Sequence, residues 1–394
     1  MSHIARQTPK FLLAPVNSLQ VSNNVRFNRF QSTSVKNKKN SQLRGDSIIY
    51  GESSAHKKAS SRILNDSITI GDKNGLKLLE RGIKKSDELT SSFTNYMFKF
   101  HKLPPNYGSN QLITIDKELQ LELNNIIGDF QAPVRYAFGY GSGVFQQAGY
   151  SKDDKSPQID MIFGVTHPSH FHSLNMRQNP QHYSTLKYFG SNFVSKFQEI
   201  GAGIYFNPYA EINGHDVKYG IVSMENLLKD LATWDTFYLA GRLQKPVKVL
   251  KNDLRVQYWN QLNLKAAATL ARHFTLKKNN GEFDDIKFYN EIAGLSYLGD
   301  VRYALGGENP NKVANIVTKN LDNFREYYKP IYKDVILNNS TYLPKWFTVE
   351  SAGGILQKKI GLSSTLQTIK GILTAGVVKS TKYAWSKKLK AYKN

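Results

Sequence analysis

A glycine-rich segment and an apolar run with one acid are the parts of this sequence that could do chemistry. Residues 139–145 read Gly-Tyr-Gly-Ser-Gly-Val-Phe, and Asp160 lies inside the apolar run 158–165. The glycine segment predicts a strand that passes into a turn and opens a helix, where outward N–H groups and missing Cβ atoms let phosphate oxygens approach. The apolar run predicts a strand carrying one carboxylate, a ligand suited to Mg²⁺. A phosphate cradle beside such a carboxylate is what nucleotidyl transfer requires.

Asp160 is expected on the opposite side of its strand from the core, because alternate residues of a strand face opposite ways. An ionised carboxylate on such a strand is costly unless a metal or a cation pairs it. We therefore favour Mg²⁺ at Asp160, and a structural salt bridge or an exposed edge position is the alternative. Two-metal nucleotidyl transfer commonly adds a second acid two residues later, but this chain has Ile162 there. The candidates for a second ligand, which the sequence does not rank, are Glu211, Asp216 and Asp300.

A polar stripe could contact the base or the ribose of a nucleotide. His172, Asn175, Asn179 and His182 are spaced by three, four and three residues, which puts them on one helical face if Pro180 permits. A solvated surface explains the same spacing equally well.

Cations follow later in the chain. Arg242, Lys245 and Lys248 lie within residues 240–248, and Lys218 lies on the strand predicted after the turn of a hairpin. Such cations could neutralise charge that develops on a leaving pyrophosphate. A loop whose cations are simply solvated is the alternative.

The elements that must position these residues follow from periodicity and turn signals. Strands are predicted at 136–139 and 158–165, and as a hairpin whose turn is Asn213-Gly214. From about residue 260 the pattern becomes helical, which places a domain boundary near Lys251. The remaining predictions are hairpin strands at 201–209 and 215–222 and helices at 112–127, 168–176, 224–231, 262–274, 284–298 and 309–336, the last with Asn309 as N-cap and Pro310 in its first turn.

Charge and composition bound the class of protein. The 394 residues include no Cys, which excludes disulfides and thiolate zinc sites, and no apolar run is long enough to span a bilayer. The net charge is +22, but the segments 1–45 and 351–394 contain many Lys and Arg and no acid, so the middle is nearly balanced. This distribution argues against nucleic acid as a partner, since a nucleic-acid-binding core should be basic on a folded face. Oligomeric state is left open.

The two ends of the chain have distinct predicted roles. Residues 1–32 have the acid-free, Arg-containing composition of a mitochondrial transit peptide, with a disordered basic tail as the alternative, and residues 33–92 are typical of a flexible linker. In the tail 341–394, apolar residues repeat at helical spacing among lysines from residue 362 onward. We expect residues 362–394 to lie on an anionic membrane surface as an amphipathic helix, with a helix docked on the protein as the alternative. The apolar residues are Leu362, Leu366, Ile369, Ile372 and Leu373, then Trp385, Leu389 and Tyr392.

Several short segments, in the same order along the chain, resemble the mitochondrial translocator assembly and maintenance proteins, a family of mitochondrial phosphatidate cytidylyltransferases. The resemblance covers about residues 93–394. It implies an α/β (α+β) nucleotidyltransferase-type domain at 93–250, a mostly helical, winged-helix-like domain at 251–340, and a C-terminal amphipathic helix. The matching segments are 139–145, 159–163, 182–184, 218–220, 240–247, 291–297 and the pair Gly299-Asp300.

The resemblance also implies a reaction and residue roles. CTP and phosphatidic acid would give CDP-diacylglycerol and pyrophosphate with Mg²⁺, for cardiolipin synthesis, by a peripheral protein on the matrix side of the inner mitochondrial membrane. Asp160 would bind the metal, and Asp300 would be catalytic or structural. The family shares the lack of a second acid after its strand Asp. The residues expected at the nucleotide are Gly141, Ser142, Gly143, His182, Tyr183, Lys218, Arg242 and Lys245.

Two other functions compete with this one. An RNA nucleotidyltransferase would use the same catalytic core but needs a basic groove on it. A non-catalytic assembly factor for inner-membrane translocases would need neither CTP nor Mg²⁺, and its function would survive loss of the Asp160 carboxylate.

Overall fold

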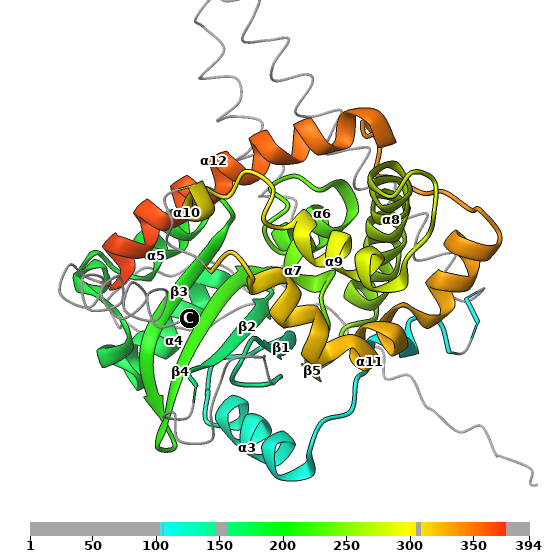
Figure 1. Cartoon of the computed structure of the whole chain (residues 1–394). Helices are drawn as coiled ribbons and strands as arrows, with labels where there is room; N and C mark the ends of the chain where they lie inside the picture. Colours follow the sequence, from blue (N-terminus) through cyan, green and yellow to red (C-terminus); the bar gives the residue numbers. More distant parts are fainter. Residues whose placement is uncertain (1–102, 105, 146–156, 305–308, 376–394) are drawn as a thin grey trace, which may run out of the picture. The chain divides into compact units, whose positions relative to one another are not determined.

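The computed structural model describes residues 103–375 except 105, 146–156 and 305–308 (Figure 1). The predicted transit peptide, the linker and the last part of the tail lie outside this range. Residues 93–394 cluster as one compact unit. No described helix is both long enough and apolar enough to cross a membrane.

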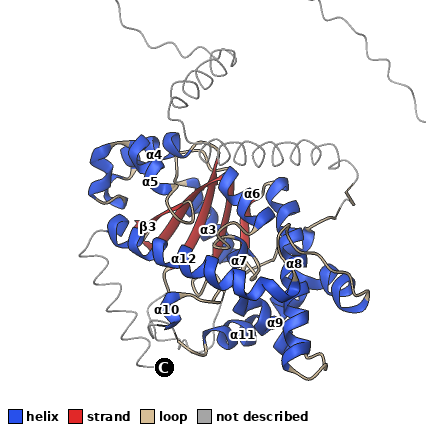
Figure 2. Ribbon diagram, turned by 90° about the horizontal axis from the view of Figure 1, so that it is seen from above, coloured by secondary structure: helices blue, strands red, loops and turns tan. Residues whose placement is uncertain are grey.

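A five-stranded mixed sheet forms the centre of this unit (Figure 2). Its order is β3-β4-β2-β1-β5; β2 and β4 run parallel, and the other neighbours are antiparallel. The central strand β2 is therefore flanked by β1, which leads into the glycine segment, and by β4, which carries Lys218. The strands are β1 (Tyr136–Tyr140), β2 (Ile159–Val165), β3 (Ile204–Ile212), β4 (His215–Ser223) and β5 (Lys248–Lys251).

Helices cover both faces of the sheet, with α4 and α5 on one side and α12 on the other (Figure 2). Short 3₁₀ turns η1 (Ser109–Gln111), η2 (Pro180–His182) and η3 (Thr185–Phe189) and a π-helical segment η4 (Lys333–Leu337) complete the described elements. The α-helices are α3 (Lys117–Gly128), α4 (Pro168–Gln178), α5 (Ser191–Gln198), α6 (Met224–Thr233), α7 (Ala240–Leu243), α8 (Leu254–Lys278), α9 (Asp285–Leu295), α10 (Val301–Ala304), α11 (Lys312–Tyr332) and α12 (Val349–Ala375).

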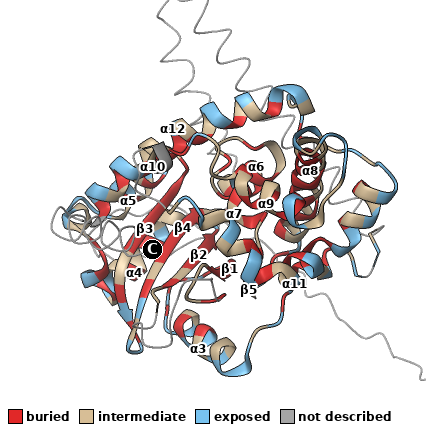
Figure 3. Ribbon diagram, viewed as in Figure 1, coloured by how far each residue is buried: buried red, intermediate tan, exposed pale blue. Residues whose placement is uncertain are grey.

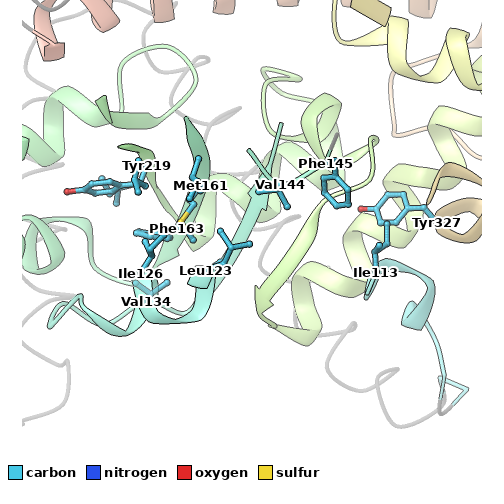
Figure 4. Packing of buried hydrophobic residues seen from close by; sticks show 14 of the residues in the cluster. Ile113, Leu123, Ile126, Val134, Val144, Phe145, Met161, Phe163, Tyr219 and Tyr327 are labelled. Carbon is cyan, nitrogen blue, oxygen red and sulfur yellow. The ribbon is translucent and has the colours of Figure 1, made fainter. Parts of the chain in front are cut away.

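Strand alternation divides the interior into two apolar clusters, one on each face of the sheet. Met161 and Phe163 of β2 pack with α3, α4, α9 and α11, and Figure 4 shows part of this cluster. Ile162, which points the other way, packs with α6, α7 and α12. Because Asp160 shares its side with Ile162, its carboxylate lies on the α6–α7–α12 face.

The strand predictions for β1 to β4 are confirmed, with small shifts at the ends, and so are helices in the regions of α3, α4 and α6. The sequence did not predict α5 or β5, and α8 begins at Leu254, eight residues before the predicted start. The predicted helix begins at Lys312, two residues after Pro310. Asn309 still accepts a hydrogen bond on its side chain from the N–H of Asn311 (2.8 Å), as a capping residue does, and its carbonyl accepts from the N–H of Lys312 (3.0 Å), so a single turn precedes the α-helix.

Between β5 and residue 340, the regular elements that the structure describes are all helices, joined by short turns and loops. The long helix α8 packs against both α6 and α9, and its buried residues belong to both apolar clusters. The boundary near Lys251 stays a prediction.

Helix α12 has an unusual distribution of polarity in its C-terminal half. Its buried side includes Lys370, whose Nζ donates to the carbonyls of Gln198 (2.9 Å) and Ile200 (2.6 Å). Its other buried residues there are Ser363, Ser364, Gln367 and Thr374, whereas Leu362, Ile369, Ile372 and Leu373 are exposed. Figure 3 shows exposed and buried positions alternating along this helix.

Candidate active site

Asp160 lies at the meeting point of three strands. Its register partners are Tyr140 on β1 and Lys218 on β4. Its Oδ1 accepts from Lys218 Nζ at 3.0 Å and from the Tyr140 hydroxyl at 3.4 Å. The side chains of Lys218 and Asp160 are 23% and 24% exposed, so this ion pair is open to solvent on one side and can rearrange around a ligand. Burial raises the pKa of Tyr140, which therefore keeps its proton and remains a donor.

The glycine segment turns directly above this carboxylate. Gly141 adopts φ +77°, and a Cβ there would lie 3.2 Å from Asp160 Oδ2. A Cβ on Gly143 would lie 2.6 Å from the carbonyl oxygen of Gln158, so neither position accepts a side chain without displacing backbone or the carboxylate. The N–H groups of Val144 and Phe145 close the turn on the Gly141 carbonyl. Residues 141–145 are thus a turn against β2, and the helix predicted to follow falls in the undescribed residues 146–156.

The short helix α7 brings Arg242 to the same face of the sheet. Its guanidinium carbon lies 4.2 Å from the Tyr140 ring centroid and 5.4 Å from that of Tyr238. Burial lowers the pKa of Arg242, but Tyr140, Tyr238 and Asp160 outweigh burial and hold it above the usual value. Among the described residues, no group accepts a hydrogen bond from its buried Nε. Arg242 is therefore a fixed cation with donor capacity to spare.

Lys245 and Lys312 extend this positive region. Lys245 Nζ donates to the Gly241 carbonyl (2.7 Å) and to Ser296 Oγ (2.6 Å). The ammonium groups of Lys245 and Lys312 each lie 5.4 Å from the Tyr297 ring centroid. Burial, then Arg242 and Lys312, lower the pKa of Lys245 well below its usual value. Cations this close repel one another, so a polyvalent anion would be stabilised among them.

Sequence reasoning missed two residues of this arrangement. Lys312 stands at the start of α11, far from any recognised segment, and only the fold places it at Tyr297. Asp230, at the end of α6, accepts hydrogen bonds from the backbone N–H groups of Thr236, Phe237, Leu239 and Ala240. It thereby fixes the entry to α7 and the position of Arg242, and no sequence signal distinguished it from an ordinary helical acid.

The predicted base-binding stripe lies on the other face of the sheet. Tyr219 follows Lys218 on β4 and so points away from Asp160. Its hydroxyl contacts His182 Nδ1 (2.9 Å) and accepts from Asn175 Nδ2 (2.8 Å). Asn175 Nδ2 also donates to Tyr183 (3.0 Å). The structure therefore does not bring His182 and Tyr183 to Asp160; both are buried partners in a hydrogen-bonded network.

His172 belongs to the same network. Its Nδ1 contacts the Tyr183 hydroxyl, and its Nε2 donates to Gln198 Oε1, each at 2.9 Å. Burial lowers the pKa of His172 to about 4, against the raising effect of the Gln198 hydrogen bond. It is neutral at physiological pH and acts as a structural hydrogen-bonding group.

The three candidates for a second metal ligand are occupied differently. Asp300 is buried, caps the N–H of Arg302 and forms a two-point ion pair with its guanidinium (3.0 and 2.6 Å). Asp216 lies on the same side of β4 as Lys218 and accepts from Gln158 Nε2 (2.9 Å), and Glu211 is its exposed register partner on β3. Lys248 is buried and donates to the Ile113 carbonyl (2.8 Å), away from the cluster of Arg242 and Lys245. Nowhere in the described ranges do three His or acidic groups gather as a metal site.

The chemistry of the Asp160 face is that of an anion site with one carboxylate. Lys218 pairs with Asp160 beside the glycine turn, Arg242 stacks on Tyr140, and Lys245 and Lys312 lie farther along, beside the Tyr297 ring. In the described structure, hydrogen bonds reach Oδ1 of Asp160, while Oδ2 faces the turn. A carboxylate oxygen beside a phosphate cradle suits Mg²⁺, which binds through one or two carboxylates and completes its shell with substrate phosphates and water.

Known proteins of one family are similar to this chain. The family described as mitochondrial phosphatidate cytidylyltransferase matches residues 123–345 and 344–390. The mitochondrial phosphatidate cytidylyltransferase of Saccharomyces cerevisiae is 67% identical over 365 residues, 93% of each chain. Those of Schizosaccharomyces pombe and Mus musculus are 45% and 41% identical over 223 and 212 residues, covering 56% and 53% of this chain and 56% and 61% of their own. The chain belongs to the mitochondrial phosphatidate cytidylyltransferase family.

Proposed function

We propose that this protein transfers CMP from CTP to phosphatidic acid, giving CDP-diacylglycerol and pyrophosphate. Family membership supports the reaction. The single observation that carries the mechanism is the meeting of Asp160, the Gly141 turn and Arg242 of α7 on one face of the sheet. In that arrangement the glycine turn (Gly141, Ser142 and Gly143) would receive the triphosphate.

The reaction needs little covalent help from the protein. A phosphate oxygen of phosphatidic acid forms a bond to the α-phosphorus of CTP, and the bond from that phosphorus to the bridging oxygen of the β-phosphate breaks. Arg242, Lys245 and Lys312 would hold the β- and γ-phosphates and stabilise the charge that develops on pyrophosphate. The attacking phosphate is already ionised, so no strong general base is required.

Asp160 would hold Mg²⁺ together with phosphate oxygens of the substrate. The ion would supply positive charge at the α-phosphate. Lys218, now paired with Asp160 Oδ1, would then turn toward a phosphate oxygen. Asp300 has its carboxylate committed to Arg302, which favours the structural role over the catalytic one.

The sheet and its parallel β2–β4 pair support a nucleotidyltransferase-type fold, in which the strand with the metal-binding acid lies beside a glycine turn. For the winged-helix-like domain the support is helices α8, α9 and α11 alone. The names of the relatives support a mitochondrial location. We place the protein on the matrix side of the inner membrane, where its product would feed cardiolipin synthesis.

Helix α12 would bring the protein to its lipid substrate. Its exposed residues Leu362, Ile369, Ile372 and Leu373 stand opposite buried polar ones, the reverse of a helix that faces water. An anionic bilayer would accept the apolar side and attract the lysines of the tail. This supports residues 362–394 as a membrane-associating segment.

The test is direct. The purified protein is incubated with Mg²⁺, dispersed short-chain phosphatidate and each of the four NTPs in turn, and pyrophosphate and the lipid product are measured. Product with CTP alone is the expected result. Pyrophosphate release without phosphatidate, or extension of an RNA primer, would replace this proposal with an RNA nucleotidyltransferase. Absence of turnover and of CTP binding would favour a non-catalytic assembly factor.

A further inference from the structure

Exposed aromatic side chains on η3 and α5 form a ridge that takes no part in the proposed nucleotide site. Tyr188 and Phe189 are 79% and 67% exposed, and Phe193 is 40% exposed. The rings of Phe189 and Phe193 lie 5.0 Å apart, and Phe197 continues the stack. Aromatic side chains this large and this exposed, grouped together, mark an interaction surface.

The spacing makes the ridge continuous. Phe193 and Phe197 lie one turn apart on α5, Phe189 at the end of η3 continues the row before the helix, and Ile200 follows the helix, with its N–H bonded to the Phe197 carbonyl. The opposite face of α5, through Val194 and Gln198, is buried in the protein.

The ridge ends against α12. Lys370 of α12 donates to the carbonyl of Ile200, and a Cβ on the next residue, Gly201, would lie 3.1 Å from the Leu366 side chain. Ile200 is itself 49% exposed. The ridge therefore ends where α12 packs on the protein, through Lys370 on the buried side of that helix and Leu366 next to it.

The charge around the ridge identifies its partner. No acidic residue occurs from Met161 to Gln198, a stretch that contains Arg177, Lys187 and Lys196. Lys187 Nζ lies 5.4 Å from the Tyr188 ring centroid, so a cation and an amphipathic ring share one edge of the ridge. Aromatic rings flanked by lysines favour the interface of an anionic bilayer, where rings enter the headgroup layer and ammonium groups stay with the phosphates.

We infer that the η3–α5 ridge is a second membrane contact, which inserts into an anionic bilayer beside α12. The inference rests on the proposed function in one respect, that the substrate is a bilayer lipid. Two contacts on one rigid unit bind more tightly than one, because the second forms at a high effective concentration. They also fix the orientation of the sheet toward the membrane, which a single helix would leave free to rotate.

The full chain offers a clean probe, because it contains no Cys. A Tyr188→Cys variant is labelled with a polarity-sensitive fluorophore, and Leu121→Cys, on α3 and 64% exposed, is the matched control. Vesicles of phosphatidylcholine with phosphatidate are added. We expect a blue shift at position 188, weaker with phosphatidylcholine alone, and none at position 121. An unchanged spectrum at position 188 would overturn the inference, and so would a label whose emission is already blue-shifted before vesicles are added. A label that responds only to protein concentration would also overturn it and would indicate that a second copy of the chain covers the ridge.

A second experiment separates docking from catalysis. A Phe189→Ser, Phe193→Ser variant should lose about tenfold in its partition to these vesicles, while a Leu121→Ser, Ile286→Ser variant, which loses exposed apolar residues on α3 and α9, should not. With dispersed short-chain phosphatidate both variants should match wild type. Unchanged partition of the aromatic variant would end the inference and leave the enzyme intact, whereas inactivity of wild type itself on the short-chain lipid would count against the proposed function.

Discussion

The polar residues on the two faces of the sheet have different surroundings. On one face, His172, Asn175, Tyr183 and Tyr219 are buried and hydrogen-bond to one another. On the other, Arg242 keeps a buried Nε for which the described residues provide no acceptor, and Lys245 is crowded by further cations. Neighbouring residues of β4 divide between the two, since Tyr219 joins the network and Lys218 joins Asp160.

The difference separates structure from function. Buried polar groups that hydrogen-bond to one another, as those around Tyr219 do, specify how a core packs. Several cations around one carboxylate leave an excess of positive charge. Each cation raises the electrostatic cost of keeping the next one charged, and an anionic ligand would lower that cost. We therefore propose that the stripe predicted from spacing serves stability, and that the cations Arg242, Lys245 and Lys312 bind substrate.

The largest effect should come from removing the carboxylate on the cation-rich face. Asp160→Asn keeps the shape of the side chain but removes the charge that would bind Mg²⁺. We expect CDP-diacylglycerol formation to fall about 10³-fold, the scale of losing a main electrostatic group at a reacting centre. Stability should change little, because the Lys218–Asp160 pair is partly exposed. Turnover within tenfold of wild type, in protein with an unchanged circular dichroism spectrum, would refute the metal assignment.

The opposite face should respond in stability instead. Asn175→Ala removes donors to Tyr183 and Tyr219 and an acceptor for Asn179, all buried. We expect a loss of about 2–3 kcal/mol in the free energy of unfolding, because buried hydroxyls lose partners. The KM for CTP should be unchanged in the protein that remains folded. Denaturant unfolding and steady-state kinetics measure the two quantities, and a higher KM without loss of stability would return the stripe to the nucleotide.

Lys312 tests how far the cation-rich face extends. Lys312→Met should raise the KM for CTP about tenfold, equivalent to about 1.4 kcal/mol, with a smaller change in kcat. Lys319→Met is the matched control, because Lys319 is an exposed cation on the same helix. If both substitutions act equally, or neither acts, Lys312 is a surface charge and the phosphate cluster ends at Lys245.

The sequence predicted the Asp160 strand and its glycine turn because both are local patterns. Alternation along residues 158–165 gave the face of Asp160, and Gly141 needs a positive φ that only a tight turn imposes. The hairpin of β3 and β4 was equally local, signalled by Asn213-Gly214. Most of the Asp160 site could therefore be predicted from the local patterns of residues 139–145 and 158–165.

The features that the sequence did not predict depend on which side of the sheet an element covers. The spacing of His172 and His182 showed a shared face but not that this face turns away from Asp160. Lys312 reaches Tyr297 through the packing of α11, and helix α5 is short and exposes its aromatic residues, so periodicity did not reveal it. Long-range placement of this kind is set by tertiary packing rather than by local pattern.

Substitution of Lys370 should have the smallest effect on catalysis. It tests the edge of the sheet, where α5 contacts α12. Burial lowers its pKa to about 7, against the raising effect of Glu199. Between that value and the usual 10.5 the unfolded chain binds more protons than the folded protein, so stability should rise with pH there, by at most about 1.4 kcal/mol per unit, and level off below about 7. Lys370→Met should remove this rise and leave turnover of dispersed phosphatidate unchanged. Unfolding midpoints at several pH values measure the slope, and equal slopes in the two proteins would mean that the ammonium is protonated throughout and that its two carbonyl bonds outweigh burial.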